Sequence, residues 1–242
     1  MKRLRQIAAG ALCVTGVMLP ILGASAAQAT AVTPLTLVNG WINAPFGTSN
    51  AAVFSTGGIV HFKGAIATGG TNPVPFILPA AFRPATEVFV PVDMCDATNG
   101  RLEISPSGVV TVEPEGKVFS NAACLTSLDG ASFAKSAKFF TSLTLKNGWK
   151  NAPFGTSKTA VHGASGVVSF KGAIASGSTS AVFTLPAAFR PAHNVYVPVD
   201  LCGATNGRLL IQHNGTVRVQ EEGNVFGNAQ CFTSLDGVSF MP

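Results

Sequence analysis

The chain contains the same module twice, and this internal repeat constrains its fold more than any other feature. The motif Asn-Ala-Pro-Phe-Gly-Thr-Ser at 43–49 returns unchanged at 151–157, and Leu-Pro-Ala-Ala-Phe-Arg-Pro at 78–84 returns at 185–191. Over the two blocks that align without gaps, 24 of 35 and 38 of 56 positions are identical. Copies this similar predict two domains of one fold, which we place at 30–134 and 135–242.

The first 29 residues are expected to be a signal peptide that is removed. A basic start is followed by an apolar run and then by small residues ending at Ala29, the order typical of secretory signals. Cleavage is expected after Ala29, with Ala26 as a second site, and Cys13 leaves with this segment. The apolar run is short and contains Pro20, which disfavours a membrane-spanning anchor. The mature protein is therefore predicted to be secreted, extracellular and not membrane-spanning.

The charge of the mature chain disfavours a nucleic-acid partner. The whole sequence has 16 Lys and Arg against 11 Asp and Glu, but Lys2, Arg3 and Arg5 belong to the signal. The remaining 13 basic and 11 acidic residues almost balance, so the basic surface that nucleic-acid binding needs is not expected.

The four mature cysteines predict two disulfide bonds in an exported protein. Three pairings are open in principle. Each copy holds one pair at the same relative positions, which favours Cys95–Cys124 and Cys202–Cys231.

Period-two alternation in both copies predicts an all-β fold. Within 58–66, Val60, Phe62 and Ile66 share one face, and the second copy is expected to turn Lys171 outward like its counterpart Lys63. Pro91 and Pro198 interrupt valine-rich runs, which indicates edge strands or bulges. No mature segment shows a clear helical period. Short strands separated by turn residues predict two tandem β-sandwich, jelly-roll-like domains, each with one disulfide.

The module resembles the head domains of phage tail fibres and receptor-binding proteins. The resemblance rests on the Phe-Lys-Gly-Ala-Ile strand at 62–66, the Leu-Pro-Ala-Ala-Phe-Arg-Pro motif at 78–84, an Ile-to-Val hairpin at 104–110 and a closing Ser-Leu-Asp-Gly segment at 127–130. It covers most of each copy and implies a jelly-roll-like sandwich, often a homotrimer, that recognises cell-surface polymers. The export signal and the cysteine pairs indicate the same module reused on a secreted bacterial protein.

No histidine is repeated between the copies, and the placement of the shared acids does not suggest a catalytic pair, so we expect no enzyme. No histidine is matched, since the aligned pairs are His61/Ser169, His162/Phe54, His193/Thr86 and His213/Pro106. The shared acids are Asp93/Asp200, Glu115/Glu222 and Asp129/Asp236. Asp129 lies in a Leu-Asp-Gly turn, where it is expected to bond its own backbone. We expect no metal and no cofactor, because the acidic loop at 93–100 loses Asp96 to Gly203 in the second copy.

The candidate ligand-binding residues are a tryptophan and two asparagines in each copy. An indole face covers the C–H groups of a sugar while neighbouring amides meet its hydroxyls. The alternative is that both tryptophans belong to the core. The candidates are Asn39, Trp41, Asn43, Asn147, Trp149 and Asn151.

Two functions lead at this stage, ahead of a periplasmic or extracellular hydrolase. The first is a secreted, non-catalytic protein that recognises a cell-surface or extracellular polysaccharide through two similar sites. The second is a structural or adaptor subunit of an extracellular protein assembly, with a protein as its partner. Exposed tryptophans in a concave face would favour the glycan function, and a large flat apolar patch or a trimer would favour the assembly function.

Overall fold

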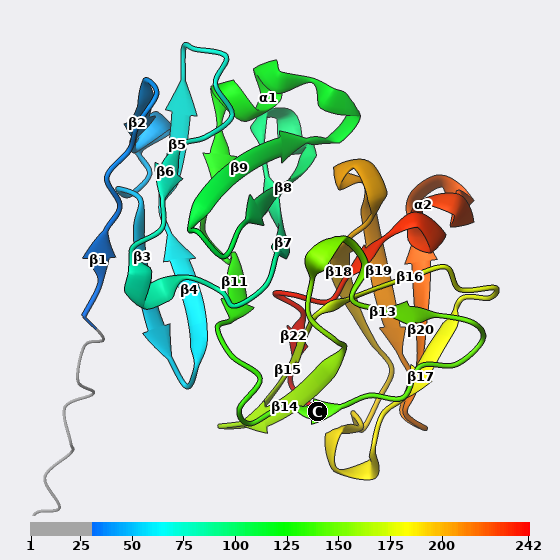
Figure 1. Ribbon diagram of the computed structural model, residues 1–242. Coiled ribbons are helices and arrows are strands. Elements are labelled where there is room, and N and C mark those ends of the chain that lie inside the picture. Colours follow the sequence, from blue (N-terminus) through cyan, green and yellow to red (C-terminus); the bar gives the residue numbers. More distant parts are fainter. Residues whose placement is uncertain (1–30) are drawn as a thin grey trace, which may run out of the picture.

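The computed structural model describes residues 31–242, and the predicted signal peptide lies outside them. Figure 1 shows two similar bodies side by side, module 1 in blue to green and module 2 in green to red. The predicted all-β class, with two similar domains and one disulfide in each, is confirmed.

Module 1 consists of short strands, four 3-10 turns and one short helix. Their bounds are β1 Thr33–Pro34, β2 Trp41–Asn43, η1 Pro45–Gly47, β3 Ala52–Thr56, β4 Ile59–Lys63, β5 Ala65–Thr68, β6 Phe76–Ile77, η2 Ala80–Phe82, β7 Val88–Asp93, η3 Cys95–Ala97, β8 Asn99–Ile104, β9 Val109–Pro114, η4 Glu115–Lys117, α1 Phe119–Cys124, β10 Thr126–Ser127 and β11 Ser132–Ala134.

Module 2 repeats the same order of elements, and its strand before the proline-rich turn is longer than that of module 1. Its elements are β12 Thr141–Ser142, β13 Lys150–Asn151, η5 Pro153–Gly155, β14 Ala160–Ala164, β15 Val167–Lys171, β16 Ala173–Ala175, β17 Ala181–Thr184, η6 Ala187–Phe189, β18 Val195–Asp200, η7 Cys202–Ala204, β19 Asn206–Ile211, β20 Thr216–Glu221, η8 Glu222–Asn224, α2 Phe226–Cys231, β21 Thr233–Ser234 and β22 Ser239–Phe240. The longer β17 pairs with β20 around a bulge between Ala181 and Phe183.

Each module holds three antiparallel sheets, and the strands of each sheet come from one module. Module 1 has the orders β1-β3-β4-β11, β2-β5-β10 and β6-β9-β8-β7, and module 2 has β12-β14-β15-β22, β13-β16-β21 and β17-β20-β19-β18. Strands β7 and β18 lie at sheet edges, as Pro91 and Pro198 predicted, since proline has no N–H for a further strand.

Each module has its own hydrophobic core. The alternation predicted for 58–66 is confirmed, because Val60, Phe62 and Ile66 are buried. The hairpin of β8 and β9 turns four apolar side chains into the same core, namely Leu102, Ile104, Val110 and Val112. A smaller third cluster of Phe89, Ala173 and Phe232 spans the two modules and joins them.

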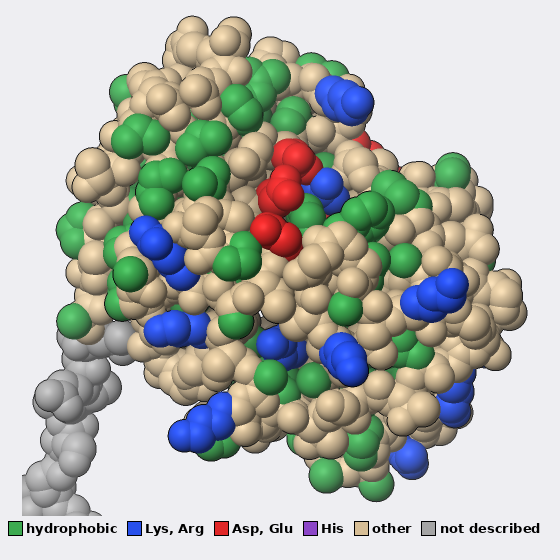
Figure 2. All heavy atoms as spheres, in the orientation of Figure 1, with side chains coloured by type: hydrophobic (Ala, Val, Ile, Leu, Met, Phe, Trp, Pro, Cys, Tyr) green, Lys and Arg blue, Asp and Glu red, His purple; other side chains and the backbone are tan. Residues whose placement is uncertain are grey.

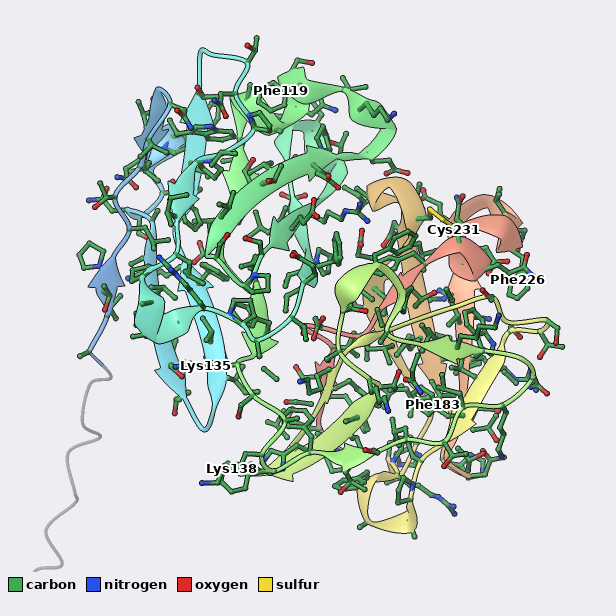
Figure 3. All side chains as sticks on the ribbon, viewed as in Figure 1. Phe119, Lys135, Lys138, Phe183, Phe226 and Cys231 are labelled. Carbon is green, nitrogen blue, oxygen red and sulfur yellow. A yellow bond between two sulfur atoms is a disulfide. The ribbon has the colours of Figure 1, made fainter. Side chains whose placement is uncertain are left out.

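The predicted disulfides are confirmed, with Cα atoms 5.8 Å apart in Cys95–Cys124 and 5.7 Å apart in Cys202–Cys231. Each bond ties a 3-10 turn to the end of a six-residue helix, α1 or α2, that the sequence did not predict. Figure 3 shows α2 with Phe226 and Cys231 labelled and the disulfide beside it. One and a half turns are too short to display a helical period.

The segment between the modules leads directly into the first strand of module 2. Phe139 is 64% exposed, Phe140 is half-buried against His162 with ring centroids 5.3 Å apart, and β12 begins at the next residue. Strand β12 pairs with β14 as β1 pairs with β3. This segment therefore packs on module 2 only in part.

Candidate functional site

The most elaborate cluster of side chains lies where the modules meet. Arg101 reaches from β8 toward module 2, where its Nη1 atom lies 3.2 Å from Oδ2 of Asp200. Its Nε donates to Oε2 of Glu113 at 2.7 Å, from the paired strand β9. The guanidinium also lies 4.7 Å from the ring centroid of Phe89 and 5.8 Å from that of Phe232. This combination of ion pair and cation–π contact fixes the orientation of the two modules.

The period of the strands explains why Arg101 points outward. Leu102 and Ile104 fill the core of module 1, so Arg101 and Glu103 project from the opposite face of β8. Glu113 projects from the same face of β9. We call Phe89, Arg101, Glu103 and Glu113 the inserting face of module 1, because they enter a surface on module 2.

The surface that receives them is held together by the second disulfide. Asp200 ends β18 just before Cys202, and Phe232 follows Cys231 at the end of α2. The rings of Phe89 and Phe232 meet edge to face with centroids 5.0 Å apart. We call Gly155, Asp200, Phe232 and Ser234 the receiving face of module 2.

Two hydrogen bonds to backbone atoms complete the junction. The hydroxyl of Ser234 donates to the carbonyl of Phe89 at 2.6 Å, and the backbone N–H of Glu87 donates to the carbonyl of Gly155 at 3.2 Å. Both bonds use groups on or just before the edge strand β7, which have no partner strand there. The junction therefore combines contacts between particular side chains with backbone hydrogen bonds, which depend less on the sequence.

Burial at the junction changes the protonation of its carboxylic acids. Burial raises the pKa of Asp200 to about 7, although Arg101 acts in the opposite direction. Burial, together with the neighbouring carboxylate of Glu113, raises the pKa of Glu103 to about 7. Figure 2 shows acidic side chains gathered beside a basic one in the groove between the modules. The contribution of these two groups to folding stability therefore falls as the pH rises toward about 7.

Two outward positions of module 2, Lys171 and Asp236, are covered by module 1 and the linker. Lys171 lies on the outward face that the alternation predicts, but it is only 7% exposed, whereas Lys63 is exposed. The prediction that Asp129 bonds its own turn is wrong. Its Oδ1 accepts from Gly64 N at 2.9 Å, and Oδ1 of Asp236 accepts from Gly172 N at 2.9 Å. Asp129 is exposed, while Asp236 is covered.

A separate cleft of about 290 Å³ also lies between the modules. Module 1 contributes His61 and Ser132, and module 2 contributes His162 and Ser169. The ring of His61 stacks on Phe54 at 5.0 Å, and burial lowers the pKa of His61. The cleft thus brings together two histidines that have no counterpart in the other copy.

The predicted ligand-binding tryptophans lie in the cores. Trp41 and Trp149 are each 5% exposed, and each meets a phenylalanine edge to face at 6.3 Å, Phe119 or Phe226. Their Nε1 atoms donate to backbone carbonyls at 2.9 Å in loops about thirty residues away. Neither indole face is open to a ligand in this structure.

The predicted asparagines use their amides to hold loops. Asn39 and Asn147 donate to the carbonyls of Val74 and Ala181, both at 2.9 Å. Asn43 and Asn151 accept at 2.8 Å from backbone N–H groups eight residues later. The same bonds occur in both copies, so these asparagines have a structural role in each module.

No group of three His, Cys, Asp or Glu among residues 31–242 could hold a metal ion. In the same range, no helix is long and apolar enough to cross a membrane. The repeat and the alternation did not reveal the junction, although Phe89 at an outward position of an alternating strand was a usable signal.

Comparison with protein families, curated proteins and solved structures finds no match to this chain.

Proposed function

We propose that this chain is an exported, non-catalytic subunit or adaptor of an extracellular protein assembly. The observation that carries the proposal is the junction, where one module binds another protein surface through an aromatic pair, an ion pair and backbone hydrogen bonds. Disulfides in both modules fit an oxidising compartment outside the cytoplasm.

Exposed aromatic side chains also favour a protein partner. Tyr196 on β18 is 56% exposed and Phe46 on η1 is 79% exposed. Large aromatic rings supply much of the binding free energy at protein interfaces. The two tryptophans offered as the sugar-binding platform are buried, which favours a protein partner over a glycan.

The test is photocrosslinking on the exported protein. A photoreactive amino acid replaces Tyr196 or Phe46 in the full chain, in the cells that export it, and Ser107 at an exposed hairpin tip serves as the control. Covalent protein adducts at Tyr196 or Phe46, and none at Ser107, support the proposal. Adducts at none of these positions contradict it.

Glycan recognition is the second candidate, and the cleft with His61 and His162 is the observation in its favour. Imidazole and hydroxyl groups both donate to and accept from sugar hydroxyls. This cleft occurs once per chain, so the candidate is one site instead of two. Loss of binding to an immobilised polysaccharide in a Ser169→Phe variant, which narrows the cleft, would support it. Unchanged binding in that variant excludes the cleft as the site.

The resemblance to phage tail-fibre heads, and the homotrimer that it implies, remain proposals.

A further inference from the structure

We propose that the mature chain binds a second copy of itself head to tail, through the same kind of contact that joins its own modules. The inserting face of module 2 would dock on the receiving face of module 1 of the next copy. By equivalence with the junction, these faces are Tyr196, Arg208, Leu210 and Gln220 on module 2, and Gly47, Asp93, Leu125 and Ser127 on module 1. This inference rests on the proposed assembly function and names its partner.

The junction uses only one of the two faces of each module. Phe89 is 5% exposed whereas its counterpart Tyr196 is 56% exposed, and Asp200 is buried whereas its counterpart Asp93 is exposed. An interface between unlike faces leaves one of each kind vacant at the two ends of the chain.

A pair of glycines shows the same difference in the backbone. A Cβ atom added at Gly237 would lie 3.2 Å from Val90 and 2.9 Å from the carbonyl of Ser132, both in module 1. At the equivalent Gly130 the same atom would meet nothing within 4 Å. The receiving face of module 1 is therefore open where that of module 2 is filled.

The vacant inserting face already has the arrangement seen at the junction. The guanidinium of Arg208 lies 4.8 Å from the ring centroid of Tyr196, as that of Arg101 lies over Phe89. Its Nε donates to Oε1 of Gln220 at 2.9 Å, as Nε of Arg101 donates to Glu113. An orientation that is preformed costs less conformational entropy on binding.

The vacant receiving face offers the matching groups. Asp93 stands where Asp200 meets Arg101, and Ser127 stands where Ser234 donates to the backbone of Phe89. Gly47 supplies the carbonyl that corresponds to that of Gly155. Leu125 replaces Phe232, so the apolar contact is kept with a smaller side chain.

Charge differences between the copies make the vacant faces more complementary than the filled ones. On the inserting side, Glu103 and Glu113 become Leu210 and Gln220, and Thr111 becomes Arg218, which lies on the same face of β20. On the receiving side, Gly203 becomes Asp96 beside Asp93. The vacant inserting face is thus cationic and the vacant receiving face anionic, which favours their association.

The test is a charge exchange followed by analytical ultracentrifugation of the processed full-length chain. The average molar mass of the wild type should increase with protein concentration. Arg208→Asp or Asp93→Arg alone should weaken association by at least about tenfold. Each variant keeps one intact face, and the two altered faces complement each other. In an equimolar mixture the two intact faces pair with each other and so do the two exchanged faces, so the variants should associate strongly again and alternate along the assembly. Lys150→Asp, at an exposed lysine outside both faces, is the matched control.

A wild type that stays monomeric at all concentrations overturns the inference. So does association that neither single variant weakens, because another surface would then be responsible. Restored association in the mixture also shows that both variants are folded, which excludes misfolding as the cause of their separate defects. A monomer that still gives photocrosslinks to other proteins would remove this inference and leave the proposed function intact. A monomer without crosslinks would remove both.

Discussion

The burial of Asp236 beneath module 1 should make the unfolding free energy depend on pH. Its carboxylate is 2% exposed, and Oδ1 accepts from Gly172 while Oδ2 has no hydrogen-bond partner. Segments of module 1 and of the linker, together with Lys171, surround it in a cavity of about 200 Å³. Burial raises the pKa of Asp236 to about 7, against an ordinary value of 3.8.

The sign of the effect follows from the direction of this shift. Between about pH 4 and pH 7 the folded protein binds a proton at Asp236 that the unfolded chain has lost, so stability falls as the pH rises through this range. A shift of this size corresponds to at most about 4 kcal/mol of unfolding free energy above pH 7. The same direction holds for Asp200, whose burial also raises its pKa.

Asp236→Asn should reduce this pH dependence. The amide keeps the acceptor for Gly172 and carries no charge. As the pH rises from 4.5 to 8, the unfolding free energy of the variant should therefore increase by about 2–4 kcal/mol relative to that of the wild type. Urea denaturation followed by circular dichroism at several pH values measures the difference. Asp129→Asn is the matched control, because Asp129 makes the same bond to Gly64 from an exposed position. Equal pH profiles for the wild type and Asp236→Asn, or equal changes in both variants, would refute the reasoning.

Two further predictions use matched pairs from the two modules. Arg101→Met leaves the buried carboxylate of Asp200 without its partner, so it should lower the unfolding free energy by about 3–5 kcal/mol, while Arg208→Met should cost less than about 1 kcal/mol in the monomer. Urea denaturation at pH 8 decides this, and equal losses would contradict the assignment of the junction. Gly237→Ala should destabilise more than Gly130→Ala, since both residues have positive φ but only Gly237 faces module 1. Thermal unfolding of the two variants measures the difference, and equal melting temperatures would contradict it.

The sequence predicted features that depend on local pattern. Alternation over 58–66 identified the buried face of a strand, and Pro91 identified an edge strand, because neighbouring residues determine both. The equivalent positions of Cys95 and Cys124 in each copy were enough to choose their pairing. These inferences needed no knowledge of how the two modules meet.

The junction could not be predicted in this way, because identical residues lie in different environments in the two copies. Asp93 and Asp200 share a local sequence, yet only Asp200 is covered by the other module. The same holds for Lys63 and Lys171. The tryptophans were uncertain for a related reason, since the carbonyl that accepts from Trp41 belongs to Asn72, in a loop whose position the local sequence does not determine.

Hydrogen–deuterium exchange of the intact mature chain at increasing protein concentration tests the central claim most directly. In the junction, the backbone N–H of Glu87 donates to the carbonyl of Gly155, and the equivalent N–H of Asn194 would donate to the carbonyl of Gly47 in the next copy. Protection should therefore increase with concentration at the start of β18 and around Cys95–Ala97 and β10, and should stay constant at β7, whose contacts are already made. Exchange that does not change with concentration, or protection gained on other surfaces, would contradict head-to-tail association through these two faces.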